Sequence, residues 1–121
     1  MPITKEHNIH KRIYNYIVRV LNLMKSLPKT PQNLIIINQI SRSATSMGAN
    51  DQEADGAMTR KDFIHCYTVV RKEGKETSYW LKLISDTNPS FMNRMESLMQ
   101  EGEEIVKIVS TIVFNSKKGA K

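Results

Sequence analysis

The residues that could bind a metal in this chain are three histidines, one cysteine and twelve carboxylates. A di-metal site in a helical bundle needs carboxylates from all four helices and two Glu-x-x-His pairs. The sequence contains one acid-x-x-His spacing, from Asp62 to His65. Three further carboxylates could approach one another from neighbouring helices: Glu53, Glu73 and Glu76. Lysine and arginine side chains stand among them, so ion pairing explains these acids better than metal binding, and we expect no metal site.

Nucleophilic catalysis would have to use Cys66, the single cysteine. A thiol nucleophile needs a histidine beside it in space, and the neighbouring His65 points about 100° away around a helix axis. The other two histidines, His7 and His10, lie near the N-terminus without ligand spacing, and we expect solvent to surround them. The sequence also contains no glycine-rich phosphate-binding loop. These observations predict a protein that is not an enzyme and uses no cofactor.

The composition is typical of one soluble domain. The chain has 121 residues, of which 40% are hydrophobic, and 18 basic against 12 acidic side chains leave a net charge of +6. A single cysteine excludes an internal disulfide framework. The longest stretch without charge, residues 30–41, is shorter than the roughly 20 apolar residues that a membrane helix needs. The first residues lack the apolar core of a signal peptide, so we expect a cytoplasmic protein.

Apolar side chains recur at alternating steps of three and four along the chain, which is the periodicity of amphipathic helices. Helix breakers divide this pattern into four segments: Pro28 with Pro31, then Gly56, then Pro89. We expect helices of matched length at about residues 6–27, 32–56, 60–86 and 89–116, in one domain spanning residues 1–121. Long amphipathic helices joined by short loops predict an all-α, antiparallel up-down four-helix bundle.

The positive charge is concentrated in the first third of the chain. Residues 1–42 contain seven basic side chains and one acidic side chain, whereas residues 43–88 and 89–121 are almost neutral. A concentrated basic face favours polyanions through counterion release. We expect phosphate contacts from five residues in or next to the first helix: Lys5, Lys11, Arg12, Arg19 and Lys25. The C-terminal lysines would supplement them: Lys117, Lys118 and Lys121.

Polar residues interrupt the inward face of the second helix. Ser43 and Asn50 fall on the same face as Ile40 and Met47. A buried amide needs hydrogen-bond partners, and we expect Glu76 on the third helix to supply one. Such a network would set the register between the second and third helices rather than bind a ligand.

The same residues carry a resemblance to a known family. Three motifs are present: Q-x-x-R-S-x-x-S from Gln39, A-N-x-x-E-A from Ala49, and K-E-x-x-E-T-x-Y-W-L from Lys72. Together they resemble the small bacterial four-helix bundle proteins encoded in intervening sequences of 23S ribosomal RNA genes. Carried over position by position, the structural signature of that family comprises Arg42, Ser43, Ser46, Asn50, Glu53, Glu76 and Trp80. The chain departs from the family pattern at Asp51, Cys66 and Gly74.

The resemblance also implies partners. The family is similar to the accessory variability protein of diversity-generating retroelements, a homopentamer whose basic surface binds nucleic acid and a reverse transcriptase. By this resemblance we expect a homo-oligomer, with a pentamer as the implied assembly. Nucleic acid and a reverse transcriptase are the implied partners.

Two functions of different class remain open. The first is a non-enzymatic module that binds nucleic acid, with RNA favoured over DNA, and with low sequence specificity because no base-reading motif is present. The second is a scaffold or adaptor between proteins, for example for a reverse transcriptase, without direct contact to nucleic acid. Its candidate contacts are apolar side chains beyond those that one core needs: Tyr14, Ile35, Ile37, Tyr79 and Trp80.

Overall fold

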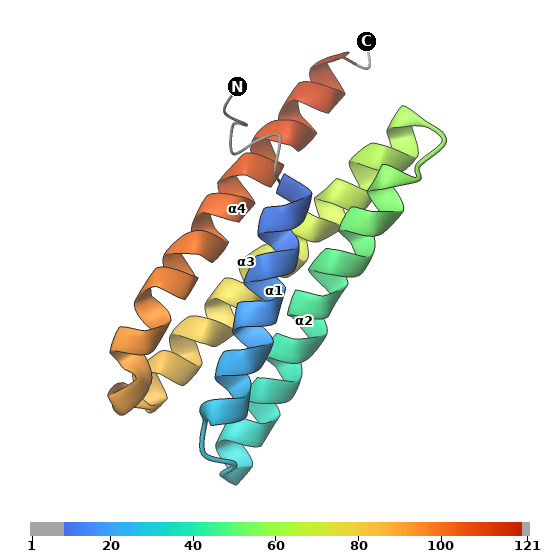
Figure 1. The fold of residues 1–121 in the computed structure, drawn as a ribbon. Helices are drawn as coiled ribbons and strands as arrows, with labels where there is room; N and C mark the ends of the chain where they lie inside the picture. The colour runs from blue at the N-terminus through green and yellow to red at the C-terminus, as the bar shows by residue number, and fades with distance from the viewer. Residues whose placement is uncertain (1–8, 120–121) are drawn as a thin grey trace.

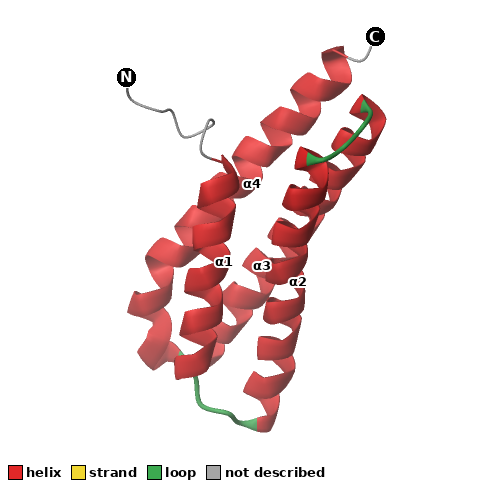
Figure 2. Ribbon diagram, turned by 45° about the vertical axis from the view of Figure 1, so that its right-hand side comes forward, coloured by secondary structure: helices red, strands yellow, loops and turns green. Residues whose placement is uncertain are grey.

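A computed structural model describes residues 9–119 of the chain. It contains four long helices, α1 (Ile9–Ser26), α2 (Pro31–Asp55), α3 (Arg60–Thr87) and α4 (Met92–Gly119), and one 3₁₀ turn, η2 (Pro89–Phe91). The helices run alternately up and down, and the connecting loops lie at the two ends of the molecule (Figure 1, Figure 2). The structure confirms the all-α, antiparallel four-helix bundle.

Local chemistry explains where the helices begin. The hydroxyls of Thr30 and Thr59 each accept a hydrogen bond at 3.1 Å from the backbone amide three residues later, which caps α2 and α3. The α4 helix begins at Met92 rather than at position 89, because the chain first makes a 3₁₀ turn at Pro89. The expected start of the first helix at residue 6 lies outside the described residues.

The described part of α1 is shorter than each of the other three helices. The described part of α1 has 18 residues, whereas α3 and α4 have 28 residues each. At 1.5 Å per residue these lengths are about 27 Å and 42 Å. As Figure 1 shows, α1 does not reach the end of the molecule at which α3 begins and α4 finishes. Within the described residues, that end is built by α2, α3 and α4.

Glycines let neighbouring helices approach closely at two places in the core. A Cβ atom at Gly74 of α3 would lie 2.8 Å from a methyl group of Val106 and 3.2 Å from the terminal methyl group of Met47. Glycine costs about 1 kcal/mol of helix stability relative to alanine. The departure from the family pattern at Gly74 therefore has a packing reason, because the side chains of α2 and α4 occupy the space of its Cβ. On α4, Gly102 makes the same kind of contact with Tyr16 of α1.

We predict that Gly102→Ala lowers the free energy of unfolding by about 1 kcal/mol. The new Cβ would overlap the Tyr16 hydroxyl and lie 2.8 Å from Cζ of its ring, which is only 1% exposed and has no room to move. Overpacking of about 1–3 kcal/mol outweighs the gain of about 1 kcal/mol in helix propensity. Urea unfolding followed by circular dichroism measures the difference.

Gly56→Ala is the matched control. The nearest atom to a Cβ at Gly56 is 3.9 Å away, and its φ of −97° suits any residue, so we expect a change below about 0.5 kcal/mol. Equal stability of the two variants would contradict the packing account of Gly102.

Candidate nucleic-acid interface

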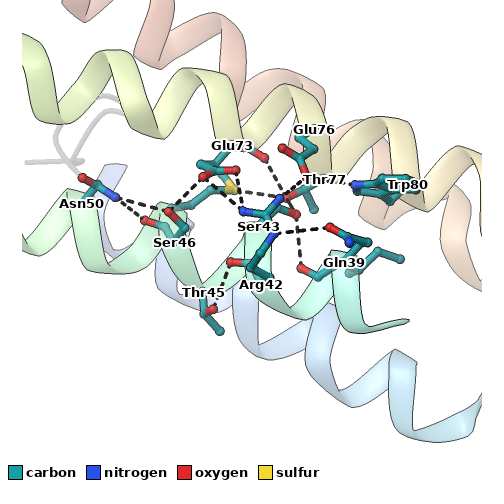
Figure 3. Close-up of polar contacts among 12 residues, drawn as sticks. Gln39, Arg42, Ser43, Thr45, Ser46, Asn50, Glu73, Glu76, Thr77 and Trp80 are labelled. Atoms are coloured by element: carbon teal, nitrogen blue, oxygen red, sulfur yellow. Dashed lines mark hydrogen bonds and ion pairs between the residues drawn. The ribbon is translucent and has the colours of Figure 1, made fainter. Parts of the chain in front are cut away.

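A ladder of hydrogen bonds joins α2 to α3 along the motifs singled out in the sequence (Figure 3). The hydroxyl oxygens of Ser43 and Thr77, both fully buried, lie 2.6 Å apart. Thr77 donates its proton to the backbone carbonyl of Glu73 at 2.8 Å. The Ser43 hydroxyl likewise lies 3.3 Å from the backbone carbonyl of Ile40, and in the bond between the two hydroxyls one oxygen donates and the other accepts.

Arg42 connects α2 to two carboxylates of α3. Its guanidinium pairs with Glu76 and lies 3.4 Å from both carboxylate oxygens of Glu73. The indole Nε1 of Trp80 donates to the same Glu76 carboxylate at 3.1 Å. The Trp80 hydrogen bond, followed by the contacts of Arg42, lowers the pKa of Glu76. Because folding lowers the pKa of Glu76, its negative charge stabilises the fold at any pH above the ordinary glutamate pKa of about 4.3. This stabilisation is lost as the pH falls through the folded-state pKa.

Glu73, rather than Glu76, links Asn50 to the third helix. The Asn50 amide donates to the backbone carbonyl of Ser46 at 3.0 Å and to its hydroxyl at 3.3 Å. The Ser46 hydroxyl in turn donates to Glu73 at 3.3 Å. Of the expected signature, Glu53 is exposed and makes no hydrogen bond to this ladder in the described part of the chain.

The sequence interpretation missed Glu73 and Thr77 as members of the ladder. Both lie on the face of α3 that also carries Glu76 and Trp80, at helical steps of three and four. This spacing was a usable signal, but it does not indicate which of two nearby glutamates faces the partner helix. The rotation of α3 against α2 decides that point.

Asp51 forms a second polar connection, between three helices. Its side chain is 3% exposed, accepts a hydrogen bond from the Tyr67 hydroxyl at 2.7 Å, and lies 2.8 Å from Nδ1 of His10. The His10 side chain is 48% exposed, as expected, and it also contacts Asp51, which connects α1 to α2. Burial, followed by the bond to Asp51, raises the pKa of Tyr67, so its hydroxyl remains a donor. The position of His7 lies outside the described residues.

The structure shows the surroundings of Cys66 and of the possible metal-ligating side chains in the described residues. Cys66 is half-buried, and burial raises the pKa of its thiol, which lowers the thiolate fraction. Between residues 9 and 119, no group of three or more His, Cys, Asp and Glu side chains could hold a metal ion. Within the same range, no helix has both the length and the apolar character that crossing a membrane requires.

Arg12 does not present its charge to solvent, which corrects the expectation for this residue. It donates to Glu101 through Nε at 3.0 Å and Nη2 at 2.7 Å, and to Glu104 at 2.9 Å. The side chain is 14% exposed, and the hydrogen bond to Glu101 is the main cause that raises the pKa of Arg12. Arg12 therefore holds α1 against α4, because two carboxylates on α4 balance its charge.

Two other arginines, Arg19 of α1 and Arg94 of α4, line a groove between these two helices. Arg19 donates to the Ser97 hydroxyl and Arg94 donates to the Ser26 hydroxyl, both at 3.1 Å, so each helix holds the guanidinium of the other. Leu23 is among the other residues that line this groove, which has a volume of about 400 Å³. In the described part of the chain, neither guanidinium has a carboxylate partner. We call this feature the α1/α4 groove.

The remaining lysines of the expected basic face have different environments. Lys11 and Lys25 are exposed, and Lys25 lies in the last turn of α1, where the helix dipole favours a cation. Lys29 donates to three backbone carbonyls at the end of α1, so it acts as a helix cap. Lys5 lies outside the described residues. The structure thus leaves Lys11, Arg19 and Lys25 available, and adds Arg94, which the sequence interpretation missed.

The fold and these contacts define a basic four-helix bundle whose polar residues mainly join helices. The family model described as 23S rRNA-intervening sequence protein matches residues 5–111. The chain therefore belongs to the 23S rRNA-intervening sequence protein family. A solved structure of a protein with unknown function from the S23 ribosomal protein family of Bacteroides thetaiotaomicron is similar, with 34% identity and a TM-score of 0.81 over 91% of this chain and 98% of that one. No curated protein shows significant similarity to this chain.

We predict that Trp80→Phe raises the pKa of Glu76 towards the ordinary value, because phenylalanine keeps a ring but loses the Nε1 donor. The free energy of unfolding near neutral pH should fall by about 1–2 kcal/mol. It should also change less than in wild type when the pH is lowered through the acidic range. An NMR titration of the Glu76 side-chain carboxyl measures the pKa.

Tyr79→Phe is the control for this prediction. Tyr79 is exposed and packs edge-on against Trp80, and its substitution removes only a hydroxyl, so the pKa of Glu76 should not change. The same Glu76 pKa in wild type and Trp80→Phe would contradict the role of the indole donor.

Proposed function

We propose that this protein is a non-enzymatic nucleic-acid-binding protein, with RNA as the favoured partner, and that the α1/α4 groove makes its main phosphate contacts. The observation that carries this proposal is the pair Arg19 and Arg94. Their guanidiniums are oriented by hydroxyls of the opposite helix, and no carboxylate in the described residues balances them. A guanidinium that keeps free N–H groups is well suited to a phosphate.

The surroundings of the groove favour backbone contacts over base reading. Lys25 lies near the same end of α1, and the residues that line the groove include no aromatic ring; the nearby Phe91 ring is already stacked against the Arg94 guanidinium, 5.0 Å from its centroid. Phosphate contacts position a protein without reading sequence, so we expect low specificity. The family is named for an intervening sequence of 23S rRNA, which is why we favour RNA over DNA.

We predict that Arg19→Gln combined with Arg94→Gln weakens RNA binding at least tenfold at low salt. The plot of log K against log salt should lose about 1.4 of its slope, since each phosphate contact to a single strand contributes about 0.7. Fluorescence anisotropy with a labelled RNA of about 20 nucleotides, over a salt series, measures both quantities. The matching DNA strand tests the preference for RNA.

Arg71→Gln combined with Lys72→Gln is a matched control. Arg71 also donates to a serine of a neighbouring helix, Ser110 at 2.9 Å, but it lies on α3, and the pair removes the same charge. This control should change affinity by less than about threefold. If wild type shows no RNA binding at low salt, or if both double variants lose affinity equally, the proposal fails.

A second candidate function, assembly with other copies or other proteins, is supported by exposed apolar side chains. Tyr14, Ile35 and Tyr79 are 68%, 65% and 61% exposed, as the scaffold hypothesis needs. Ile37 and Trp80 instead pack against the core, so they are weaker candidates. Such exposed aromatic and aliphatic side chains commonly anchor interfaces.

We predict that the protein forms a homo-oligomer, with five copies as the assembly that the family resemblance implies. Light scattering at micromolar concentration should give a mass that is a multiple of 13.9 kDa, and five times this value for a pentamer. A mass of 13.9 kDa would contradict self-assembly, and would leave a different protein as the partner of the exposed side chains.

A further inference from the structure

A second group of cations lies at the other end of α4 from the α1/α4 groove. Arg60, Lys61 and Ile64 of α3 and Lys117 of α4 line an open cleft of about 540 Å³, which we call the end cleft. The Arg60 guanidinium reaches across to α4, since a Cβ atom built on Gly119 would lie 3.1 Å from its Nη1. The cations of the cleft therefore come from two helices that run in opposite directions.

The stability of the fold does not explain why these charges are together. Between residues 9 and 119, no carboxylate forms an ion pair with Arg60, Lys61 or Lys117. Asp62 is in the same turn of α3, but it lines a separate hollow with Glu53 and so does not face the cleft. Cations in the first turn of a helix also oppose the helix dipole, which makes Arg60 and Lys61 unfavourable for α3 itself.

We propose that the end cleft binds phosphate groups of a nucleic acid, as a second contact for the strand held in the α1/α4 groove. The inference rests on the proposed function, because it takes the same polyanion as ligand. Three cations that converge without a counterion lower the free energy of a bound phosphate. The cleft is open, and its one apolar lining residue is Ile64. Such a cleft suits the sugar-phosphate backbone of an extended strand better than a small molecule, which would need an enclosed pocket.

The distance between the two sites sets the length of strand that can reach both. Arg94 and Lys117 lie 23 positions apart on α4, which corresponds to about 35 Å at 1.5 Å per residue. Stacked nucleotides advance about 3.4 Å each, so a strand needs at least about ten nucleotides to span the sites, because the two sites also lie on different sides of α4. A longer strand engages the second site at high effective concentration. Affinity should therefore rise steeply once the strand exceeds this length.

The test compares RNAs of about 6 and 24 nucleotides by fluorescence anisotropy. A longer RNA binds more tightly in any case, because it offers a greater number of binding registers. For wild type we expect the RNA of about 24 nucleotides to exceed this statistical gain in affinity at least tenfold. Arg60→Gln combined with Lys117→Gln should abolish this extra gain and leave the affinity for the short RNA within about twofold. The control, Arg71→Gln combined with Lys72→Gln, should retain the gain. All variants are checked for fold by circular dichroism and thermal melting.

A second measurement separates this inference from the proposed function. Pyrophosphate added to the wild-type protein should shift the backbone amide NMR signals of Arg60, Lys61 and Lys117. If RNA binds but the Arg60/Lys117 variant keeps the full length dependence, the end cleft is not a contact, and the proposed function stands. If RNA of neither length binds at low salt, the proposed function fails and this inference fails with it. Pyrophosphate shifts would then indicate only a site for small phosphates.

Discussion

The charge buried between α2 and α3 sets the register on which the rest of the bundle depends. Glu73 is 9% exposed, and a carboxylate in that position is costly unless it is paired. Arg42 and Ser46 of α2 both reach it, while one turn away the hydroxyls of Ser43 and Thr77 meet in the core. A slip of one turn would separate both sets of partners at once. The apolar core is not directional, so this polar ladder selects one arrangement of the two helices.

The other helices are attached by contacts of the same kind. Asp51 accepts hydrogen bonds from α1 and α3, and Arg12 of α1 reaches two carboxylates on α4. Close packing completes the arrangement. Gly74 has no Cβ, so α4 can approach α3 more closely than it could with any other residue at this position. Together these connections join α1 to α2, α1 to α4, α2 to α3 and α3 to α4. Dispersed polar contacts of this kind give an ordinary hydrophobic bundle one specific topology.

The distribution of free charge differs from the distribution along the chain. The sequence places the net charge of +6 almost wholly within residues 1–42. In the structure, acids of the later helices balance Arg12 and Arg42, whereas Arg94 of α4 and Arg60 of α3 have no acidic partner among residues 9–119. Linear charge counting therefore predicted a basic face, but it selected only some of the cations that the described structure leaves without an acidic partner.

The sequence by itself determined the elements: the periodic apolar positions and the breakers at Pro28, Gly56 and Pro89 predict four helices and an antiparallel bundle. These signals are local, because they depend on residues within one or two turns of each other. Only the tertiary structure decided that Asn50 connects to Glu73 and not to Glu76, and that the α1/α4 groove includes Arg94. Such choices depend on the rotation and offset of helices distant in sequence, and helical periodicity does not specify either quantity.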